Sequence, residues 1–281
     1  MFTYYEVLQT SGAAKGAPEV NALNSAPLLT RILADFRFLL QQIGTRPALV
    51  QIEPDFWAYA QRINPNPHLI AASVPSANPT DCGSQEASIA GFGRCLIAMT
   101  RKYAPAAKIG LHASGFATGV DVLLNKDVTL DVAAEGAKVG AFLAACGAAD
   151  GDFVTVDSSD RDAGFYASQG RATTWDASNA QLPNFRQAFR WSKAVAETLG
   201  LPVLWWQLPV GNAAQTNQPN HWQDNRVDYF FAHTDELATA HAAGMLFGGG
   251  AAGQTTPETD GGNLRNKAQA YATSGGQRLC P

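Results

Sequence analysis

Charged residues are scarce in this sequence. Asp, Glu, Lys and Arg make up 16% of its 281 residues, whereas an average globular domain carries about 25%. The hydrophobic fraction is 46%, so the chain can bury a large core, and a disordered chain is excluded. The sequence has 20 Lys and Arg against 24 Asp and Glu, and it contains no basic run that could follow a phosphate backbone. This argues against nucleic acid as a partner.

Long apolar runs and metal-binding cysteine patterns are also missing. No apolar stretch approaches the roughly 18 residues of a membrane span, and the N-terminus lacks the basic and apolar segments of an export signal. The 4 cysteines show no Cys-x-x-Cys spacing, which makes a zinc site a poor interpretation. They are Cys82, Cys95, Cys146 and Cys280. Cys82 and Cys95 are close enough in sequence to form a disulfide in an oxidising compartment, and buried free thiols are the alternative.

Motifs for common cofactors and catalytic groups are absent or incomplete. There is no G-x-S-x-G, H-E-x-x-H or Walker sequence. The glycines from Gly248 to Gly253 match G-x-G-x-x-G, but no apolar helix and no βαβ unit follow them, so dinucleotide binding is not expected. Asp157, Asp160 and Asp162 resemble part of a calcium loop without its distal Glu. We therefore expect no cofactor and no metal.

Short apolar segments alternate with helical patterns along the chain. The clearest helix starts after the N-cap residues Asn24 and Ser25, ends at Gly44 and has apolar residues at helical spacing. Further helices are expected over 87–103, 132–148 and 182–199. Strands are expected over 2–8, 48–52, 108–112, 153–157, 203–208, 227–233 and 245–247. This rhythm predicts an α/β fold with one domain over 1–281, a TIM-like (β/α) barrel of seven strands, with an open doubly wound sheet as the alternative.

The scarce acidic residues gather where the predicted strands end. Parallel barrels build their sites from the loops at this edge. The polar and aromatic residues expected there are Glu6, Gln9, Glu53, Asp55, His112, Ser114, Asp157, Asp160, Asp162, Trp205, Trp206, Gln207, His233, Asp235, Glu258 and Asp260. Paired carboxyl groups suit glycoside hydrolysis, in which one protonates the leaving oxygen and the other activates water or attacks.

Tryptophan and histidine at the same strand ends are candidate sugar contacts. Trp57, Trp205 and Trp222 offer flat apolar faces, although core packing is the alternative for some of them. Because side chains alternate along a strand, only one of Trp205 and Trp206 is expected to be exposed as a platform. His112 and His233 are candidates for binding substrate hydroxyls, or else structural histidines.

Several short segments together resemble one enzyme family. Gln51-Ile52-Glu53-Pro54-Asp55 ends a strand and resembles the E-P-D signature of glycoside hydrolase family six, the cellobiohydrolases and endoglucanases acting on β-1,4-glucan. In the same order, 108–115 is similar to the family's D-A-G-H strand, and 153–159 to its D-T-S segment. Glu258-Thr259-Asp260-Gly261-Gly262 resembles its G-E-x-D-G loop. The first-strand Asp and the final-loop Lys of that family have no counterparts here, which favours a divergent or separate family.

This resemblance implies a distorted seven-stranded barrel and an inverting mechanism. By position, Asp55 is the general acid and Asp260 the base, with Asp157, Asp160 and Asp162 as other base candidates. From their residue types at or near the strand ends, Glu53, Trp57, His112, Asp160, Trp205, Gln207, Trp222, His233 and Glu258 are expected to contact substrate.

The leading hypothesis is a secreted glycosidase that acts on a polysaccharide, with an export signal that is not part of this sequence. A noncatalytic carbohydrate-binding barrel is the alternative. Neither hypothesis implies a protein partner.

Overall fold

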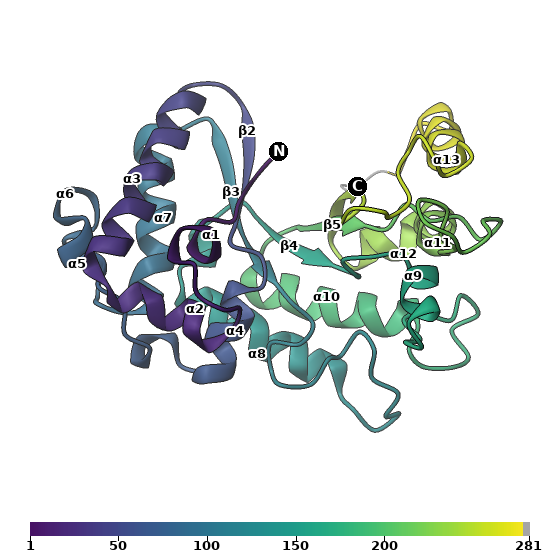
Figure 1. The fold of residues 1–281 in the computed structure, drawn as a ribbon, viewed down its shortest axis with the longest axis horizontal. Coiled ribbons are helices and arrows are strands. Elements are labelled where there is room, and N and C mark those ends of the chain that lie inside the picture. The colour runs from purple at the N-terminus through teal and green to yellow at the C-terminus, as the bar shows by residue number, and fades with distance from the viewer. Residues whose placement is uncertain (278–281) are drawn as a thin grey trace. The chain divides into compact units, whose positions relative to one another are not determined.

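The computed structural model describes residues 1–277 and has an α/β fold (Figure 1). Its six strands follow one another in chain order within one sheet. They are β1 (Phe2–Tyr4), β2 (Ala48–Ile52), β3 (Ala107–Ala113), β4 (Phe153–Asp157), β5 (Val203–Leu208) and β6 (Ala242–Phe247). The β1–β2, β2–β3 and β5–β6 pairs are parallel. In this order β1 and β6 are the two edges, so the described strands do not close the predicted barrel.

The prediction of a seventh strand over 227–233 is wrong. This segment belongs to α11 (Arg226–Ala232), a helix in which Arg226, Val227, Tyr229 and Phe230 are buried. Its valine and aromatic residues have high strand propensity. Tertiary packing of one helical face overrides that preference. The first predicted strand is also shorter, because α1 (Val7–Ser11) starts where the second half of that strand was expected.

The chain forms two compact units, each made of several segments. Unit 1 comprises Met1–Val120, Gly136–Thr155 and Val195–Leu201, and unit 2 comprises Asp121–Glu135, Val156–Ala194 and Pro202–Pro281.

Helices and a disulfide build unit 1 around β1, β2 and β3. The predicted first helix is α3 (Ala26–Ile43), in which the Ser25 side chain caps the Leu28 N–H and Gly44 ends the helix. It packs against α7 (Ile89–Tyr103). The Cys82–Cys95 disulfide joins α6 (Pro79–Cys82) to α7, while Cys146 is a buried free thiol and Cys280 lies outside the described residues. The other elements reaching into this unit are α2 (Ala17–Asn21), η1 (Ala22–Asn24), α4 (Phe56–Ile63), η2 (Pro67–Leu69), α5 (Val74–Ala77), α8 (Val132–Ala145) and η3 (Ala148–Asp150).

Aromatic side chains form the core of unit 2. Trp205 on β5 contacts Trp175, Phe189 and Phe230 through edge-to-face pairs with ring centroids 5.2–6.4 Å apart. Its helices are α9 (Ala163–Ser168), most of α10 (Phe185–Leu199), α11, α12 (Thr234–Thr239) and α13 (Asn263–Thr273).

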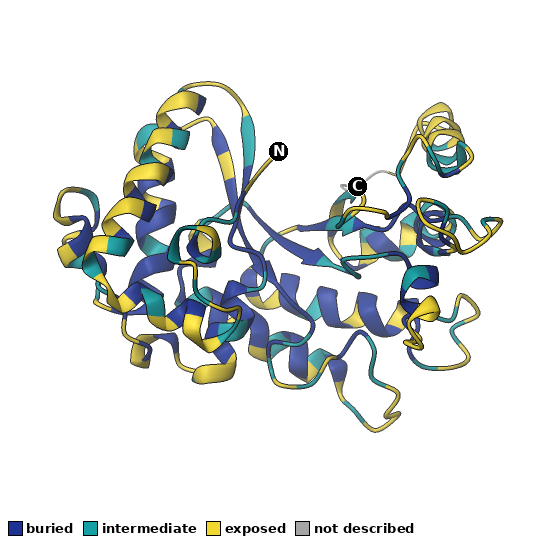
Figure 2. Cartoon of the chain, viewed as in Figure 1, coloured by how far each residue is buried: buried dark blue, intermediate teal, exposed yellow. Residues whose placement is uncertain are grey.

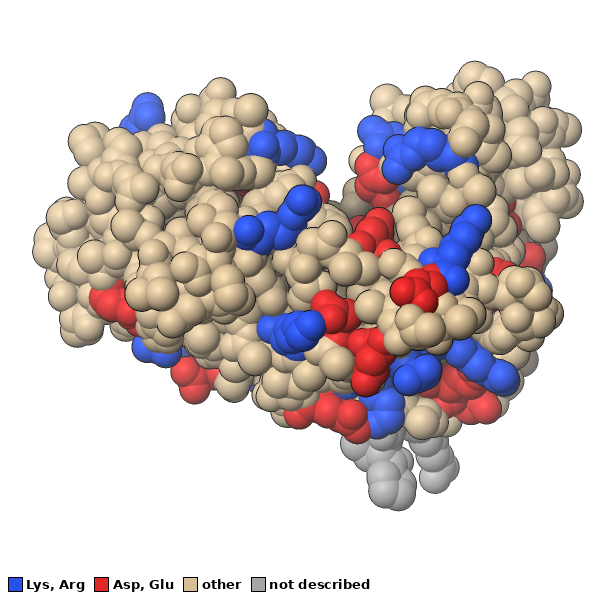
Figure 3. All heavy atoms as spheres, turned by 90° about the horizontal axis from the view of Figure 1, so that it is seen from below, with Lys and Arg blue, Asp and Glu red and all other residues tan. Residues whose placement is uncertain are grey.

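Burial follows this arrangement. Figure 2 shows buried residues along β3 and β4 and along one side of α10. Uncharged side chains cover most of the face in Figure 3, as the low charge content predicts. No helix within residues 1–277 combines the length and apolar character needed to cross a bilayer.

Candidate active site

The backbone at the carboxyl end of β2 is unusual. Glu53 and Asp55 have φ angles of 48° and 66°, a left-handed region that disfavours side chains other than glycine. Such a conformation costs about 1–3 kcal/mol per residue and occurs often at functional sites. In the predicted E-P-D segment, the fold therefore holds both acidic residues in a backbone geometry that an ordinary turn would avoid.

Glu53 is completely buried and is anchored to the segment after β1. Its Oε1 atom accepts the backbone N–H groups of Glu6 at 2.8 Å and Val7 at 3.0 Å. Its Oε2 atom has no hydrogen-bond partner among the described residues. Burial raises the pKa of Glu53 to about 8, although the two N–H groups act in the opposite direction. Glu53 thus carries a proton at neutral pH, because a buried carboxylate without a cation is costly.

Asp55 presents its carboxyl group to the surface. Its side chain is 30% exposed, and the Lys15 ammonium lies 3.8 Å from Oδ2. The Ser114 hydroxyl, just after β3, donates to Oδ1 at 3.4 Å. The two acidic residues of E-P-D therefore differ, since one is enclosed by protein and the other can reach a ligand.

A second buried carboxyl group and two tyrosines surround this pair. Glu19 on α2 is fully buried, and burial raises its pKa, with Asp55 adding to the effect. Burial is the main cause of the raised pKa of Tyr5, and the negative charge of Glu19 adds to it. Burial is also the main cause of the raised pKa of Tyr59, and the negative charge of Asp55 adds to it. Tyr5, Lys15, Glu19, Glu53, Asp55 and Tyr59 are named here the β2 carboxyl cluster.

A row of polar side chains crosses four neighbouring strands of unit 1, from the exposed Thr3 to the buried Gln51, His112 and Thr155. The Thr3 hydroxyl donates to Oε1 of the Gln51 side chain at 3.0 Å. The Nε2 atom of Gln51 lies 3.1 Å from His112 Nδ1 and donates to the Thr155 hydroxyl at 3.0 Å. His112 is 1% exposed. This geometry favours a structural role over the predicted substrate contact.

The predicted tryptophan platforms are buried. Trp57 is 1% exposed, and its indole N–H donates to the Ile52 carbonyl at 3.0 Å. Trp205 is 0% and Trp222 6% exposed. Trp206 is half-buried. The two tryptophans differ in exposure as strand alternation predicts, but Trp206 is the more accessible one and not Trp205, the expected sugar contact.

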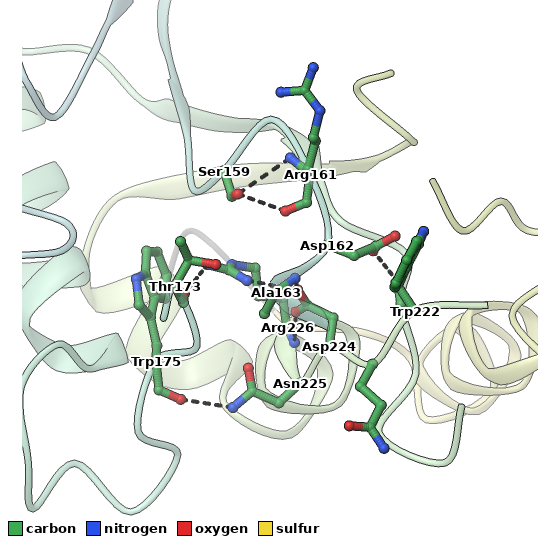
Figure 4. A network of polar contacts seen from close by, with 12 residues as sticks. Ser159, Arg161, Asp162, Ala163, Thr173, Trp175, Trp222, Asp224, Asn225 and Arg226 are labelled. Carbon is green, nitrogen blue, oxygen red and sulfur yellow. Dashed lines mark hydrogen bonds and ion pairs between the residues drawn. The ribbon is translucent and has the colours of Figure 1, made fainter. Parts of the chain in front are cut away.

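Unit 2 contains a buried polar network centred on two carboxylates (Figure 4). Both oxygens of Asp162 accept backbone N–H groups at 2.8 Å, from Gly211 and Thr255, and burial raises its pKa to about 6. Asp224 binds Arg226 at 2.8 Å, with both side chains 0% exposed, and also accepts the Ala163 N–H at 2.7 Å. These contacts tie the loop after β4 to the segment before α11.

Asp224→Asn is expected to lower the free energy of unfolding by about 3 kcal/mol, because it leaves the buried Arg226 guanidinium without its counter-charge. Urea unfolding followed by tryptophan fluorescence measures the loss. Asp235→Asn, at an exposed position of α12, is the matched control and should stay within about 0.5 kcal/mol of wild type. A loss below about 1 kcal/mol in Asp224→Asn would contradict this account of the pair.

The remaining predicted site residues lie in unit 2. Asp260 is buried, and its two oxygens accept the N–H groups of Gly262 and Leu264 at 2.7 Å each. This geometry favours capping of α13 over the role of base. Asp160 contacts Tyr166 and Arg161, and Asp157 is half-buried at the end of β4.

The other three predicted contacts differ in their surroundings. Gln207 has a φ of 54°. His233 follows α11 instead of a strand, stacks on Tyr229 with centroids 3.9 Å apart and pairs with Glu236 at 3.2 Å. Glu258 is exposed.

The glycine-rich segment after β6 has a packing role. A side chain on Gly250 would place its Cβ 2.0 Å from the carbonyl oxygen of Asp160. The loops after β4 and β6 therefore approach closely because residue 250 lacks a side chain. No group of three or more His, Cys, Asp or Glu side chains suited to a metal occurs within residues 1–277.

Sequence reasoning missed Glu19, Tyr5, Lys15 and Tyr59. Tyr59 had a usable signal, since it lies one helical turn after Asp55. The other three had none, because α1 takes the place of the second half of the expected first strand and the segment up to α2 lies beside the end of β2.

Comparison with known proteins adds no family to this description. No family model matches the chain, and no curated protein matches it.

Proposed function

We propose that this protein is a glycoside hydrolase that cleaves a polysaccharide, with Asp55 as the general acid. The observation that carries the proposal is the contrast at the end of β2. Asp55 is a 30% exposed carboxyl group on strained backbone, supported by a hydroxyl and by buried carboxyl groups. An acid needs a carboxyl group that can reach the glycosidic oxygen and whose surroundings disfavour additional negative charge.

The surroundings of Asp55 support this role. Asp55 is coupled electrostatically to the buried Glu19, since the charge of Asp55 adds to the rise in the pKa of Glu19 that burial causes. After proton transfer, the Lys15 ammonium at 3.8 Å stabilises the Asp55 carboxylate. The half-buried rings of Tyr59 and Phe116 offer apolar faces to a sugar.

The assignment of a catalytic base to Asp157, Asp160, Asp162 or Asp260 stays a sequence prediction. Both oxygens of Asp162 and Asp260 bind backbone N–H groups, and Asp160 contacts Tyr166 and Arg161. An inverting outcome is proposed on the strength of the family resemblance. The Cys82–Cys95 disulfide supports an oxidising compartment, in keeping with secretion.

A panel of polysaccharides and oligosaccharides, led by β-1,4-glucans, tests the activity. Proton NMR of the first product should show shortened chains whose new reducing ends have the anomeric configuration opposite to the substrate's. A retained configuration would replace inversion by a nucleophilic mechanism. Binding without any product across the panel would contradict hydrolysis and favour the carbohydrate-binding alternative.

A further inference from the structure

Three side chains on one face of α4 lead away from the carboxyl cluster. Asp55 precedes the helix, and Tyr59 and Arg62 follow at intervals of four and three residues, the spacing that places side chains on the same helical face. The segment after β3 runs along this face. We name residues 55, 59 and 62 with residues 114, 116 and 118 the α4 track.

Contacts between the helix and this segment are regular. The Ser114 hydroxyl donates to Asp55 at 3.4 Å. One helical turn further along, the rings of Tyr59 and Phe116 lie with centroids 5.4 Å apart. Arg62 and Thr118 then line the same groove. An acidic, an aromatic and a cationic position therefore succeed one another along the track.

The groove at the end of the track has the dimensions of a ligand site. Its volume is about 760 Å³, within the range of about 300–1,000 Å³ typical of small-molecule sites. Its walls are joined where the Gln61 amide donates to the Lys138 carbonyl of α8 at 3.2 Å. Phe142 and Pro67 supply buried apolar surface.

Charge at the groove has one sign. Arg62 and Lys138 line it, and its lining, which lies entirely within the described residues, contains no Asp or Glu. Arg62 is exposed. The exposed Arg62 guanidinium favours an anionic ligand group, to which it can donate charge-assisted hydrogen bonds.

We propose that the α4 track binds a glycan chain that extends from Asp55 across Tyr59 and Phe116, and that the groove receives a sugar unit carrying a carboxylate. Tyr59 and Phe116 contact the ring faces of the chain, and Arg62 binds the carboxylate. This inference rests on the proposed function and narrows the substrate class from polysaccharides in general to those with acidic units.

Cello-oligosaccharides and their C6-oxidised counterparts form a matched pair of probes, because they differ only in the carboxylate at C6. Isothermal titration calorimetry with wild-type protein and with Asp55→Asn measures their affinities. The oxidised chain is expected to bind about tenfold more tightly than the neutral one at low salt. Salt should reduce the difference, because it screens exposed charges.

Arg62→Gln removes the guanidinium that we assign to the carboxylate, and Arg62 is exposed, so the change should not disturb folding. It is expected to abolish the preference for the oxidised chain, while Arg31→Gln, an exposed cation on α3, should leave the preference intact. Equal affinities of wild type for both chains, no binding of either chain, or an unchanged preference in Arg62→Gln would each overturn the proposal. Binding of the oxidised chain without hydrolysis of any glycan would uphold this site and contradict the enzymatic function.

Discussion

Asp55→Asn is expected to lower kcat/KM on the polysaccharide substrate by about a thousandfold, the typical contribution of general acid catalysis. The amide cannot protonate the leaving oxygen, yet it has nearly the same shape and can still accept from Ser114 and face Lys15. Initial rates of reducing-end formation, together with the thermal unfolding midpoint of each variant, measure this effect.

Asp235→Asn provides the matched control. It makes the same chemical change at an exposed position of α12, outside the carboxyl cluster, and should retain wild-type kinetics. Turnover by Asp55→Asn within a few-fold of wild type would remove Asp55 from the mechanism. A loss of activity accompanied by unfolding would instead assign it a structural role.

Glu53→Gln is expected to stabilise the protein in alkaline solution. The pKa of Glu53 rises from an ordinary value of 4.5 to about 8 because the side chain is buried. The folded state therefore retains the Glu53 proton over a range in which the unfolded chain releases it. Glu53 favours folding most below pH 4.5, and stability is lost as the pH rises from about 4.5 to about 8.

The full cost of ionising Glu53 over this range is about 5 kcal/mol, at 1.36 kcal/mol per pKa unit. A glutamine has no proton to lose, and its carbonyl can still accept from Glu6 and Val7. Urea unfolding measures the free energy of unfolding of wild type and of Glu53→Gln. The two values should be similar at pH 5, and the variant should be the more stable protein at pH 9.

Glu258→Gln is the control for this experiment, because Glu258 is exposed. The free energy of unfolding of Glu258→Gln should change with pH in the same way as that of wild type. Glu19 and Asp162 also have raised pKa values, but they titrate in all three proteins, so the difference between curves isolates Glu53. Parallel curves for wild type and Glu53→Gln would show that Glu53 is ionised in the folded state.

Local signals in the sequence predicted many elements well. The cap at Ser25, the apolar spacing that follows and Gly44 located α3 to within a residue. The apolar runs of β2, β4 and β5 were located in the same way, because buried parallel strands leave a continuous apolar pattern. The Cys82–Cys95 disulfide is confirmed by the structure.

Long-range packing decided what the sequence could not disclose. The residues of α11 combine strand propensity with a helical burial pattern, and only their neighbours in unit 2 select the helix. Trp57 and Trp205 looked like sugar platforms, but large aromatic side chains also fill cores, and residue type does not separate the two uses. The partner of Asp224 was not foreseen, although Arg226 is two residues away, because burial of both groups depends on the whole of unit 2.

The most direct test of Asp55 as the acid compares two substrates in Asp55→Asn. The 2,4-dinitrophenolate group of an aryl glycoside leaves without being protonated. A sugar leaving group must be protonated as it departs. Our account predicts that the variant loses about a thousandfold on the oligosaccharide and keeps near-wild-type rates of glycosidic cleavage on the aryl glycoside. Equal losses on both substrates would contradict the assignment of Asp55 as the proton donor.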